Sequence, residues 1–325
     1  MRYQNIIVRM PNWMGDCIMA TPVLQDLKET FPKARLMALC KRPLHTLLEN
    51  NPFVDEIWSF TQPQEAVFKM RKTLCDVGIL LTNSLSSTWM FVRGKVRTRI
   101  GFQRGIRTLF LTHALSMPKQ PEHLVTTYKR VLEPLGIFHS SSLPRMVVTK
   151  EEAARAEDML RAYPKPVIGI HPVATYGPAK CWPAERFRKV TEELLRSRSC
   201  TILYVGNADA KETIGNIVAE FPSHVVNMAG KTTMRELASL LQKCSLLLTN
   251  DSGPMHLADA LDVPVVALFG STCDIRTGPY RRNGVMIHKR VTCSPCFRRT
   301  CPIDFRCMNE ISVEEVLHAV EQHLV

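Results

Sequence analysis

Short apolar runs alternate with amphipathic stretches along most of this 325-residue chain, and the alternation predicts its fold class. A continuous apolar run between turn residues is typical of a strand buried on both faces of a parallel sheet. Stretches whose apolar residues recur every three or four positions are typical of amphipathic helices. We expect strands at residues 5–10, 35–39, 56–60, 77–82, 167–171, 201–205, 225–228, 245–250 and 264–269.

The amphipathic stretches predict helices between most of these strands. The first, residues 17–31, contains Pro22, which predicts a kink or a later helix start because proline has no N–H to donate inside a helix. Further helices are expected at residues 63–74, 84–92, 123–135, 151–163, 183–196, 209–221, 233–242, 257–261 and from residue 312 onward.

The order of these elements predicts two α/β domains. A linker is expected between residues 136 and 150, where three serines at 140–142 and then Pro144 interrupt the pattern. We assign residues 1–150 to one Rossmann-like, doubly wound domain and residues 151–325 to a second, which faces the first across a cleft. Such sheets bind ligands at the carboxyl ends of their strands. No GxGxxG motif follows the first strand, which argues against a dinucleotide-dependent oxidoreductase.

Composition is that of a globular protein, with 45% hydrophobic and 22% charged residues. No apolar run approaches the roughly 20 residues that a membrane-spanning helix needs. Arg9 and Pro11 interrupt the first apolar run before it could form the core of a signal peptide. We therefore expect a cytoplasmic protein.

The formal net charge of +12 predicts an anionic partner. Nucleic acid, an acidic membrane surface and a phosphorylated or carboxylated substrate all qualify, but the sequence contains no nucleic-acid-binding module. Two basic clusters stand out, although such clusters are often only solvated surface. The first comprises Arg93, Lys95, Arg97, Arg99, Arg104 and Arg107, and the second comprises Arg281, Arg282, Lys289, Arg290, Arg298, Arg299 and Arg306.

Four of the eleven cysteines form a separate group near the C-terminus. Cys293, Cys296, Cys301 and Cys307 have the spacing C-x2-C-x4-C-x5-C. A CxxC start is typical of zinc and iron–sulfur ligands, and a metal bound there would be structural. Free or redox-paired thiols remain an equal alternative.

The turn at residues 251–256, Asp-Ser-Gly-Pro-Met-His, lies between an expected strand and an expected helix. A helix start with small residues presents free N–H groups and the positive end of a dipole, which suits a phosphate. Asp251 and His256 add hydrogen-bonding groups beside it. The alternative is that Asp251 or Ser252 only caps the helix.

Three other strand ends carry polar groups. Asp16 follows the first strand, where a carboxylate could act as a general base or simply cap the next helix. Thr175 and Lys180 lie in a Gly- and Pro-containing loop after residue 171, which is suited to a pyrophosphate. Asp209, after another strand, could bind ribose hydroxyls. Hydroxyls at Ser271 and Thr272 close the strand ending at residue 269.

Four motifs together resemble one known family. They are Pro-Asn-Trp-Met-Gly-Asp at 11–16, Gly-Pro-Ala-Lys-Cys-Trp-Pro at 177–183, Asn-Asp-Ser-Gly-Pro-Met-His at 250–256 and Leu-Phe-Gly-Ser-Thr at 268–272. In this order they resemble glycosyltransferase family 9, the lipopolysaccharide heptosyltransferases, and the first two resemble the type II branch more than type I. Many type II members carry a similar cysteine segment, but not all do.

The resemblance implies a GT-B fold and inverting transfer of heptose from ADP-heptose, with no required cofactor or metal. Asp16 would be the general base, Lys180 would contact donor phosphate and sugar, and Asp251 would hold heptose hydroxyls. The remaining donor-binding residues implied by position are Thr175, Asp209, Lys231, Thr232, Ser252, Gly253 and His256.

The resemblance also accounts for the basic charge. The acceptor would be lipid A bearing 3-deoxy-octulosonic acid and one heptose, which carries phosphates and carboxylates. Trp13, Arg99, Arg104 and Arg107 are the candidate acceptor residues. The same surface would favour peripheral contact with the cytoplasmic face of the inner membrane.

Three alternatives stay open at this point: addition of the first heptose in place of the second, a different donor sugar, and a GT-B nucleotide-sugar-binding protein without transfer activity. The presence of Asp16, Lys180 and Asp251 together argues against the last.

Overall fold

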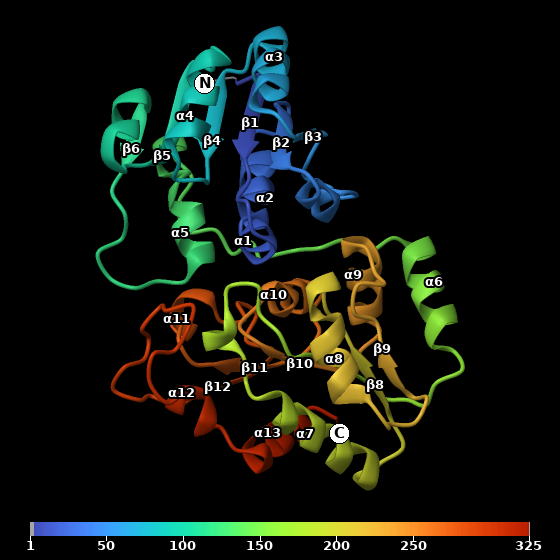
Figure 1. Ribbon diagram of the computed structural model, residues 1–325. Helices are drawn as coiled ribbons and strands as arrows, with labels where there is room; N and C mark the ends of the chain where they lie inside the picture. Colours follow the sequence, from blue (N-terminus) through green and yellow to red (C-terminus); the bar gives the residue numbers. More distant parts are fainter. Residues whose placement is uncertain (1–2, 325) are drawn as a thin grey trace. The chain divides into compact units, whose positions relative to one another are not determined.

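The computed structural model describes residues 3–324 and divides into two compact units, Met1–Val147 and Val148–Val325. Each unit is an α/β domain built on one six-stranded sheet in which all neighbouring strands are parallel (Figure 1). This confirms the α/β, Rossmann-like class. Among residues 3–324, no helix is long and apolar enough to cross a membrane.

The sheet of unit 1 has the strand order β3-β2-β1-β4-β5-β6. Its strands are β1 (Asn5–Arg9), β2 (Arg35–Lys41), β3 (Glu56–Phe60), β4 (Val77–Leu80), β5 (Thr98–Phe102) and β6 (His113–Leu115). Its helices are α1 (Met14–Met19), α2 (Thr21–Thr30), η1 (Leu44–Leu48), α3 (Pro63–Thr73), α4 (Leu85–Arg93), η2 (Gly105–Phe110), α5 (Leu124–Arg130) and η3 (Glu133–Leu135). Helix α3 packs against α4, and α2 packs against α5.

The sheet of unit 2 has the order β12-β11-β10-β7-β8-β9. Its strands are β7 (Val167–His171), β8 (Thr201–Tyr204), β9 (Val225–Asn227), β10 (Leu246–Asn250), β11 (Val265–Phe269) and β12 (Gly284–His288). Its helices are α6 (Lys150–Leu160), η4 (Pro178–Lys180), α7 (Ala184–Ser197), η5 (Ala208–Ala210), α8 (Lys211–Val218), α9 (Met234–Gln242), α10 (Gly253–Ala260), α11 (Asp274–Thr277), α12 (Arg306–Asn309) and α13 (Val313–Glu321).

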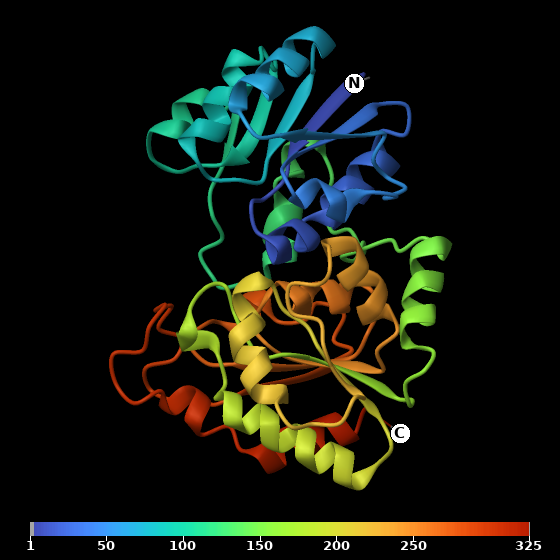
Figure 2. The ribbon, with the colours of Figure 1, turned by 45° about the vertical axis from the view of Figure 1, so that its right-hand side comes forward.

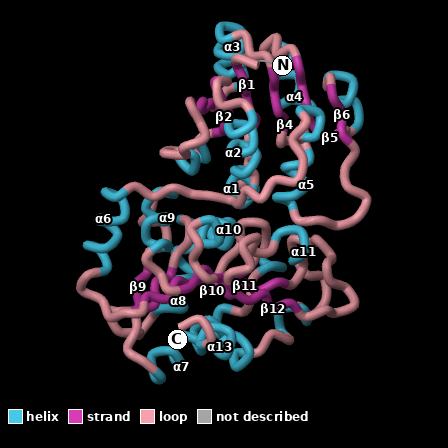
Figure 3. The backbone as a smooth tube through the Cα atoms, turned by 180° about the vertical axis from the view of Figure 1, so that it is seen from behind, coloured by secondary structure: helices cyan, strands magenta, loops and turns pink. Residues whose placement is uncertain are grey.

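Strand order is therefore the same in both units when unit 2 is followed from β9. In each, the chain starts in the middle of the sheet, winds to one edge, returns and winds to the other. Helices α7 and α13 cover one face of the unit 2 sheet, and α9 and α10 cover the other (Figures 2 and 3). Strands β7, β8, β10 and β11 are buried along their whole length, as expected for a sheet with both faces covered.

The first predicted helix is in fact two helices. Helix α1 ends and α2 begins around Ala20, and Pro22 lies in the first turn of α2, where its missing N–H removes no helical hydrogen bond. The break at this proline was predicted, but the start was placed too late. Helix α1 begins at Met14, so Asp16 lies in its first turn and not in a loop.

Three strands were not predicted. Each of β5, β6 and β12 contains exposed or partly exposed positions, which interrupt the apolar pattern, and β6 and β12 are edge strands. The helix expected at 123–135 ends at Arg130, and a short 3₁₀ helix containing Pro134 follows. The helix expected at 257–261 begins earlier, at Gly253.

Candidate functional site

Each sheet has one place where the winding reverses, between β1 and β4 in unit 1 and between β7 and β10 in unit 2. At such a place the loops leaving the two strands diverge to opposite faces and leave an opening at the carboxyl edge, where ligands bind. Most of the predicted site residues follow these four strands or their neighbours.

In unit 2 the loop after β7 meets the turn after β10. Lys180 Nζ lies 2.5 Å from Asp251 Oδ2, and Thr272 Oγ1 donates to the same oxygen at 2.7 Å. The two charged side chains are only 12% and 4% exposed, so the pair is partly desolvated and its attraction is stronger than that of a surface pair. The structure thus brings together a cation, a carboxylate and a hydroxyl from three separate loops.

Helix α10 begins directly beside this group. Ser252 is its N-cap residue but makes no side-chain cap hydrogen bond, and its hydroxyl lies 3.1 Å from Thr249 Oγ1. The Asp251 carboxylate is engaged by Lys180 and Thr272. Helix capping is therefore not the role of either side chain here. The N–H groups of Gly253 and Met255 in the first turn, where Pro254 has none, point out of the helix end, as anion-binding amides do.

Two more polar residues are buried in the same turn. His256 lies in the first part of α10 and is buried. The side chain of Asn250 accepts from the Trp182 amide at 3.0 Å, while its own Nδ2 is buried without a hydrogen-bond partner. A buried unpaired donor at a site edge is a group that a ligand can satisfy. Asn250 stood inside a recognised motif, but nothing in the sequence marked its amide as unpaired.

A second pair of loops forms beside β8 and β9. The amide of Gly230 donates to Gly206 O at 2.9 Å, and Gly230 has a φ of +65°. A Cβ at Gly230 would lie 3.0 Å from Ala208 Cα, so glycine permits the two loops to touch. Asp209 and Lys231 lie on these loops and hydrogen-bond locally, Asp209 with Asn207 and Lys231 with Asn227. The predicted donor-binding residues Asp209, Lys231 and Thr232 therefore lie in one neighbourhood.

Thr175 lies in the exposed part of the loop after β7. The neighbouring Tyr176 was not singled out from the sequence. Its ring lies 4.9 Å from Lys180 Nζ and 5.4 Å from the Arg299 guanidinium, and its hydroxyl donates to Phe297 O at 2.6 Å. Tyr176 thus joins the Lys180 loop to the cysteine-rich segment.

That segment carries the four grouped cysteines, and all eleven cysteines are free. Among residues 3–324, no group of three or more His, Cys, Asp or Glu side chains is arranged to hold a metal ion. The segment instead contacts the loop that carries Lys180, because Arg299 O accepts from the Ala179 amide at 3.0 Å. A side chain at Gly177 would place Cβ 2.5 Å from that same carbonyl oxygen, so glycine is needed for this contact.

In unit 1, Asp16 lies in the first turn of α1 and is half-buried. Its Oδ1 accepts from the hydroxyl of Tyr128 on α5 at 2.9 Å. The N-cap residue is Trp13, so Asp16 does not cap the helix. Trp13 itself is 56% exposed. An anionic side chain in a first turn is favoured by the helix dipole, and one oxygen held by a tyrosine fixes its orientation.

Arg107 is a cation of unit 1 that is buried beside neutral groups. Its Nε donates to Thr88 Oγ1 at 3.0 Å and its NH1 to Asn83 Oδ1 at 2.9 Å, while NH2 is buried without a partner. Burial, and less strongly the nearby Arg104, lower the pKa of Arg107 to about 10, so it stays cationic at neutral pH. A buried cation with an unpaired N–H is suited to an anion.

The other two arginines predicted to bind the acceptor lie at opposite ends of β5. Arg104 is exposed just before η2, after the carboxyl end of β5. Arg99 lies near the amino end of β5, where its Nε donates to Phe110 O at 2.7 Å and its NH1 to Val96 O at 2.6 Å. The structure therefore places Arg104 and Arg107, but not Arg99, after the carboxyl end of the strand.

One basic side chain is also buried at the carboxyl end of each of the strands β1 and β7. Arg9 donates to Asn12 Oδ1 at 2.5 Å and stacks on Phe60, and burial lowers its pKa to about 10. His171 donates from Nδ1 to Val205 O at 2.8 Å, and burial lowers its pKa to about 4. His171 is thus neutral at physiological pH.

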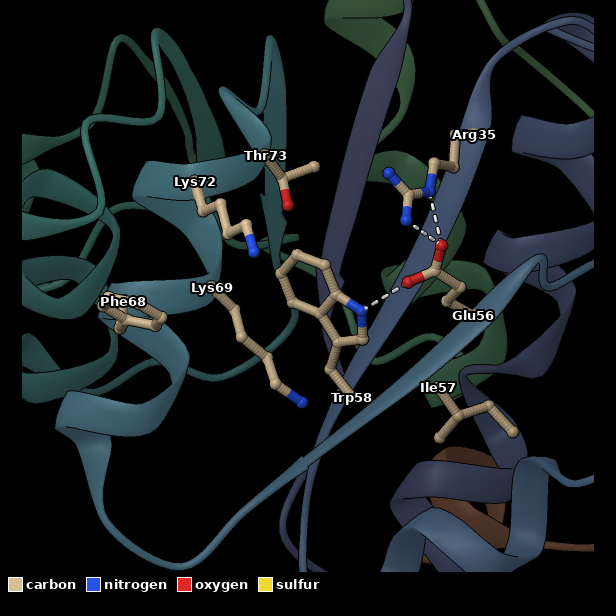
Figure 4. A pocket seen from close by; sticks show the side chains of 8 residues that line it. All are labelled: Arg35, Glu56, Ile57, Trp58, Phe68, Lys69, Lys72 and Thr73. Atoms are coloured by element: carbon tan, nitrogen blue, oxygen red, sulfur yellow. Dashed lines mark hydrogen bonds and ion pairs between the residues drawn. The ribbon is translucent and has the colours of Figure 1, made fainter.

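A cavity of about 760 Å³ lies elsewhere in unit 1, between β3 and α3 (Figure 4). Glu56 accepts hydrogen bonds from Arg35 and Trp58, and Lys69 and Lys72 flank the Trp58 ring. Arg35 and Glu56 are the first residues of β2 and β3. The cavity is therefore at the amino edge of the sheet, opposite the edge that carries the predicted site residues.

Comparison with known proteins gives consistent matches. The model of the family described as glycosyltransferase family 9 (heptosyltransferase) matches residues 67–305. The chain is 28% identical to lipooligosaccharide heptosyltransferase 2 of Campylobacter jejuni, over 98% of each chain. It is 27% identical to lipopolysaccharide heptosyltransferase 2 of Salmonella typhimurium, over 84% of this chain and 85% of that one.

Solved structures show the same fold. The E. coli ADP-heptose LPS heptosyltransferase II superposes with a TM-score of 0.87 at 23% sequence identity, covering 99% of this chain and 98% of that one. A family 9 glycosyltransferase from Veillonella parvula gives a TM-score of 0.86, also at 23% identity, over 100% and 98% of the two chains.

Proposed function

The chain belongs to glycosyltransferase family 9, the heptosyltransferases, and on this premise we propose that it adds the second heptose to the inner core of lipopolysaccharide, with ADP-heptose as donor. Relatives named heptosyltransferase 2 that span nearly all of the chain support this choice. The single structural observation that supports transfer from a nucleotide-sugar donor is the Lys180–Asp251–Thr272 group beside the start of α10 in unit 2.

The donor's pyrophosphate would occupy the start of α10. There the amides of Ser252 and Gly253 donate to it, with Thr175 and His256 nearby, and Lys180 supplies a mobile positive charge. Lys180 now pairs with Asp251, so donor binding replaces one anionic partner of the lysine with another. Asp251, still held by Thr272, is then able to accept hydrogen bonds from heptose hydroxyls. Asp209, Lys231 and Thr232 would bind the ribose and adenine.

Asp16 of unit 1 would act as the general base. It takes the proton of the acceptor hydroxyl while the acceptor oxygen forms a bond to the anomeric carbon of the heptose. The bond from that carbon to the donor's phosphate oxygen breaks, and its electron pair leaves with ADP, so the anomeric configuration inverts. Tyr128 orients the carboxylate through its hydrogen bond. Lys180 and the helix-start amides stabilise the negative charge on ADP, so this chemistry requires no metal ion.

The acceptor would bind to unit 1 through its negative charges. Arg107, buried with an unpaired N–H, and the exposed Arg104 would contact its phosphate or carboxylate groups. Trp13 offers an exposed ring beside Asp16 in sequence, suited to a sugar face. Because this acceptor carries a lipid, the proposal includes peripheral contact of the protein with the cytoplasmic face of the inner membrane.

The test is transfer from ADP-heptose by the purified chain to two acceptors, one carrying a single heptose and one carrying none. Product from the singly heptosylated acceptor alone is expected. Product only from the bare acceptor would assign the first heptose instead. Binding of ADP without product from either acceptor would point to another donor sugar or to a binding role.

A further inference from the structure

One stretch of unit 1 combines positive charge with exposed apolar side chains. Residues 77–121 contain no aspartate or glutamate. Within this stretch, the exposed cations on and between α4 and η2 are Arg93, Lys95, Arg97 and Arg104. A stretch of this length with only one sign of charge creates a local positive potential.

The apolar side chains form two aligned stripes. Leu85 and Trp89 are four residues apart on α4 and therefore share one face of that helix, which Arg93 extends by one more turn. Ile106 and Leu109 are three residues apart on η2, and in a 3₁₀ helix this spacing places both side chains on one side. Ile106 is 63% exposed and Leu109 is 79% exposed.

The two stripes belong to one surface because their helices pack together. Trp89 on α4 lies edge-to-face on Phe110 of η2, with ring centroids 5.3 Å apart. Arg107 of η2 contacts Thr88 of α4, one residue away from Trp89. We call this surface the α4–η2 face and define its apolar part as Leu85, Trp89, Ile106 and Leu109. It precedes the edge strand β6 (Figure 1).

We propose that the α4–η2 face docks onto an anionic lipid surface, with its four apolar side chains inserted at the boundary between headgroups and acyl chains. Arg93, Lys95, Arg97 and Arg104 then contact lipid phosphates. Charge complementarity favours this occupant over a second copy of the chain, because a second copy would present the same positive potential and be repelled.

Docking in this way would bring the protein to its lipid-anchored acceptor, and this part of the inference rests on the proposed function. Arg107 lies between Ile106 and Leu109 on the same short helix but points inward to Asn83 and Thr88. Insertion of the two flanking side chains therefore holds Arg107 at headgroup depth, where the phosphates of a lipid-anchored acceptor lie. Lipid binding itself is measurable with no donor or acceptor present, so the two proposals can fail separately.

The experiment is co-sedimentation of the full chain with vesicles of phosphatidylcholine alone or mixed with phosphatidylglycerol. We expect binding only to the mixed vesicles, weakened by salt because the cations are exposed. The double variant Ile106→Asp/Leu109→Asp is expected to bind at least about tenfold more weakly, since it places two carboxylates on the apolar stripe. Phe68→Asp is the matched control, because Phe68 is 70% exposed but lies on α3.

Each other outcome overturns the proposal. Vesicle binding that the double variant leaves unchanged, or that Phe68→Asp weakens equally, would place the lipid contact elsewhere. A wild-type dimer that the double variant converts to a monomer would make a second copy the occupant. Both variants should keep the wild-type melting temperature and transfer to a delipidated acceptor, while the double variant loses transfer to an acceptor embedded in vesicles. Loss of transfer to both acceptors at an unchanged melting temperature would mean that Ile106 and Leu109 act in the transfer reaction itself, and would overturn their role in lipid docking.

Discussion

Arg9 ends β1 and His171 ends β7, so these two buried side chains occupy equivalent places in two sheets of the same strand order. Burial leaves Arg9 charged, with its pKa near 10, and leaves His171 neutral, with its pKa near 4. The loops beyond these strand ends also differ in how they hold positive charge. The loops of unit 2 pair a lysine with a carboxylate, whereas unit 1 buries Arg107 among neutral partners.

Under the proposed function, this difference would let one architecture serve two kinds of anion. In unit 2 the positive charge of Lys180 is paired with Asp251, and a donor that is bound and released each turnover would replace that partner. In unit 1 Arg107 keeps an unpaired N–H, which would suit a site that holds an anionic acceptor in place. The fold supplies the two edges, and a few loop residues decide what each edge binds.

Asp16→Asn tests most directly whether catalysis and ADP binding depend on different units. Loss of the proposed base should lower kcat by about 10²–10⁴-fold, because general base catalysis typically contributes that much. ADP affinity, which we assign to unit 2, should stay within experimental error when measured by calorimetry. A variant that retains wild-type turnover would remove Asp16 from the mechanism.

The neutral His171 predicts a pH dependence of stability. Its pKa is about 4 when folded and near 6.5 when unfolded, so the unfolded chain takes up a proton first as the pH falls. Stability from this residue is complete above pH 6.5 and is lost progressively toward pH 4, by at most roughly 3 kcal/mol. His171→Asn should melt at a temperature that changes less than that of the wild type between pH 7 and pH 5. His318→Asn, an exposed control, should not flatten the profile.

Lys180→Ala tests the pair in unit 2. Removing a charged hydrogen-bond donor to the pyrophosphate should weaken ADP binding by about 10- to 100-fold. It also leaves the buried Asp251 carboxylate without its cation and with a hydrogen bond from Thr272, so some loss of thermal stability is expected. Lys189→Ala removes an exposed lysine of the same unit and should change neither property. Unaltered ADP affinity in Lys180→Ala would contradict the donor assignment.

Arg107→Met and Arg99→Met test which arginine of unit 1 contacts the acceptor and which stabilises the fold. Arg107→Met removes a buried charge with neutral partners, so acceptor KM should rise about tenfold while the melting temperature holds or increases. Arg99→Met removes hydrogen bonds to backbone carbonyls and should instead lower the melting temperature. Acceptor titrations and thermal melts of both variants measure this split, and an acceptor defect in Arg99→Met alone would reverse the assignment.

Much of the fold and part of the site could be predicted because they depend on local pattern. Apolar runs predicted the central strands, and polar residues in the loops that follow them, such as Lys180 and Asp251, fell at the expected edge. Edge strands such as β12 escaped prediction because one exposed side weakens the apolar pattern.

The features of the site that depend on long-range packing could not be predicted from the sequence. The Tyr128–Asp16 hydrogen bond joins residues far apart in sequence, so no local signal could indicate it. Arg99 and Arg107 stand in one basic cluster, yet one binds backbone carbonyls at the amino end of β5 and the other is buried against α4. Sequence shows the charges of such a cluster but not which of them the chain turns inward.

The contact between the cysteine-rich segment and the Lys180 loop has a practical consequence at the bench. Phe297 O and Arg299 O hold Tyr176 and Ala179, and the exposed thiols of Cys293 and Cys296 lie a few residues away on the same segment. We expect air oxidation or alkylation of these thiols during purification to disturb the carbonyls that hold the loop, because both belong to one short segment. Donor affinities measured with and without reductant should therefore be compared before any variant of the loop is interpreted.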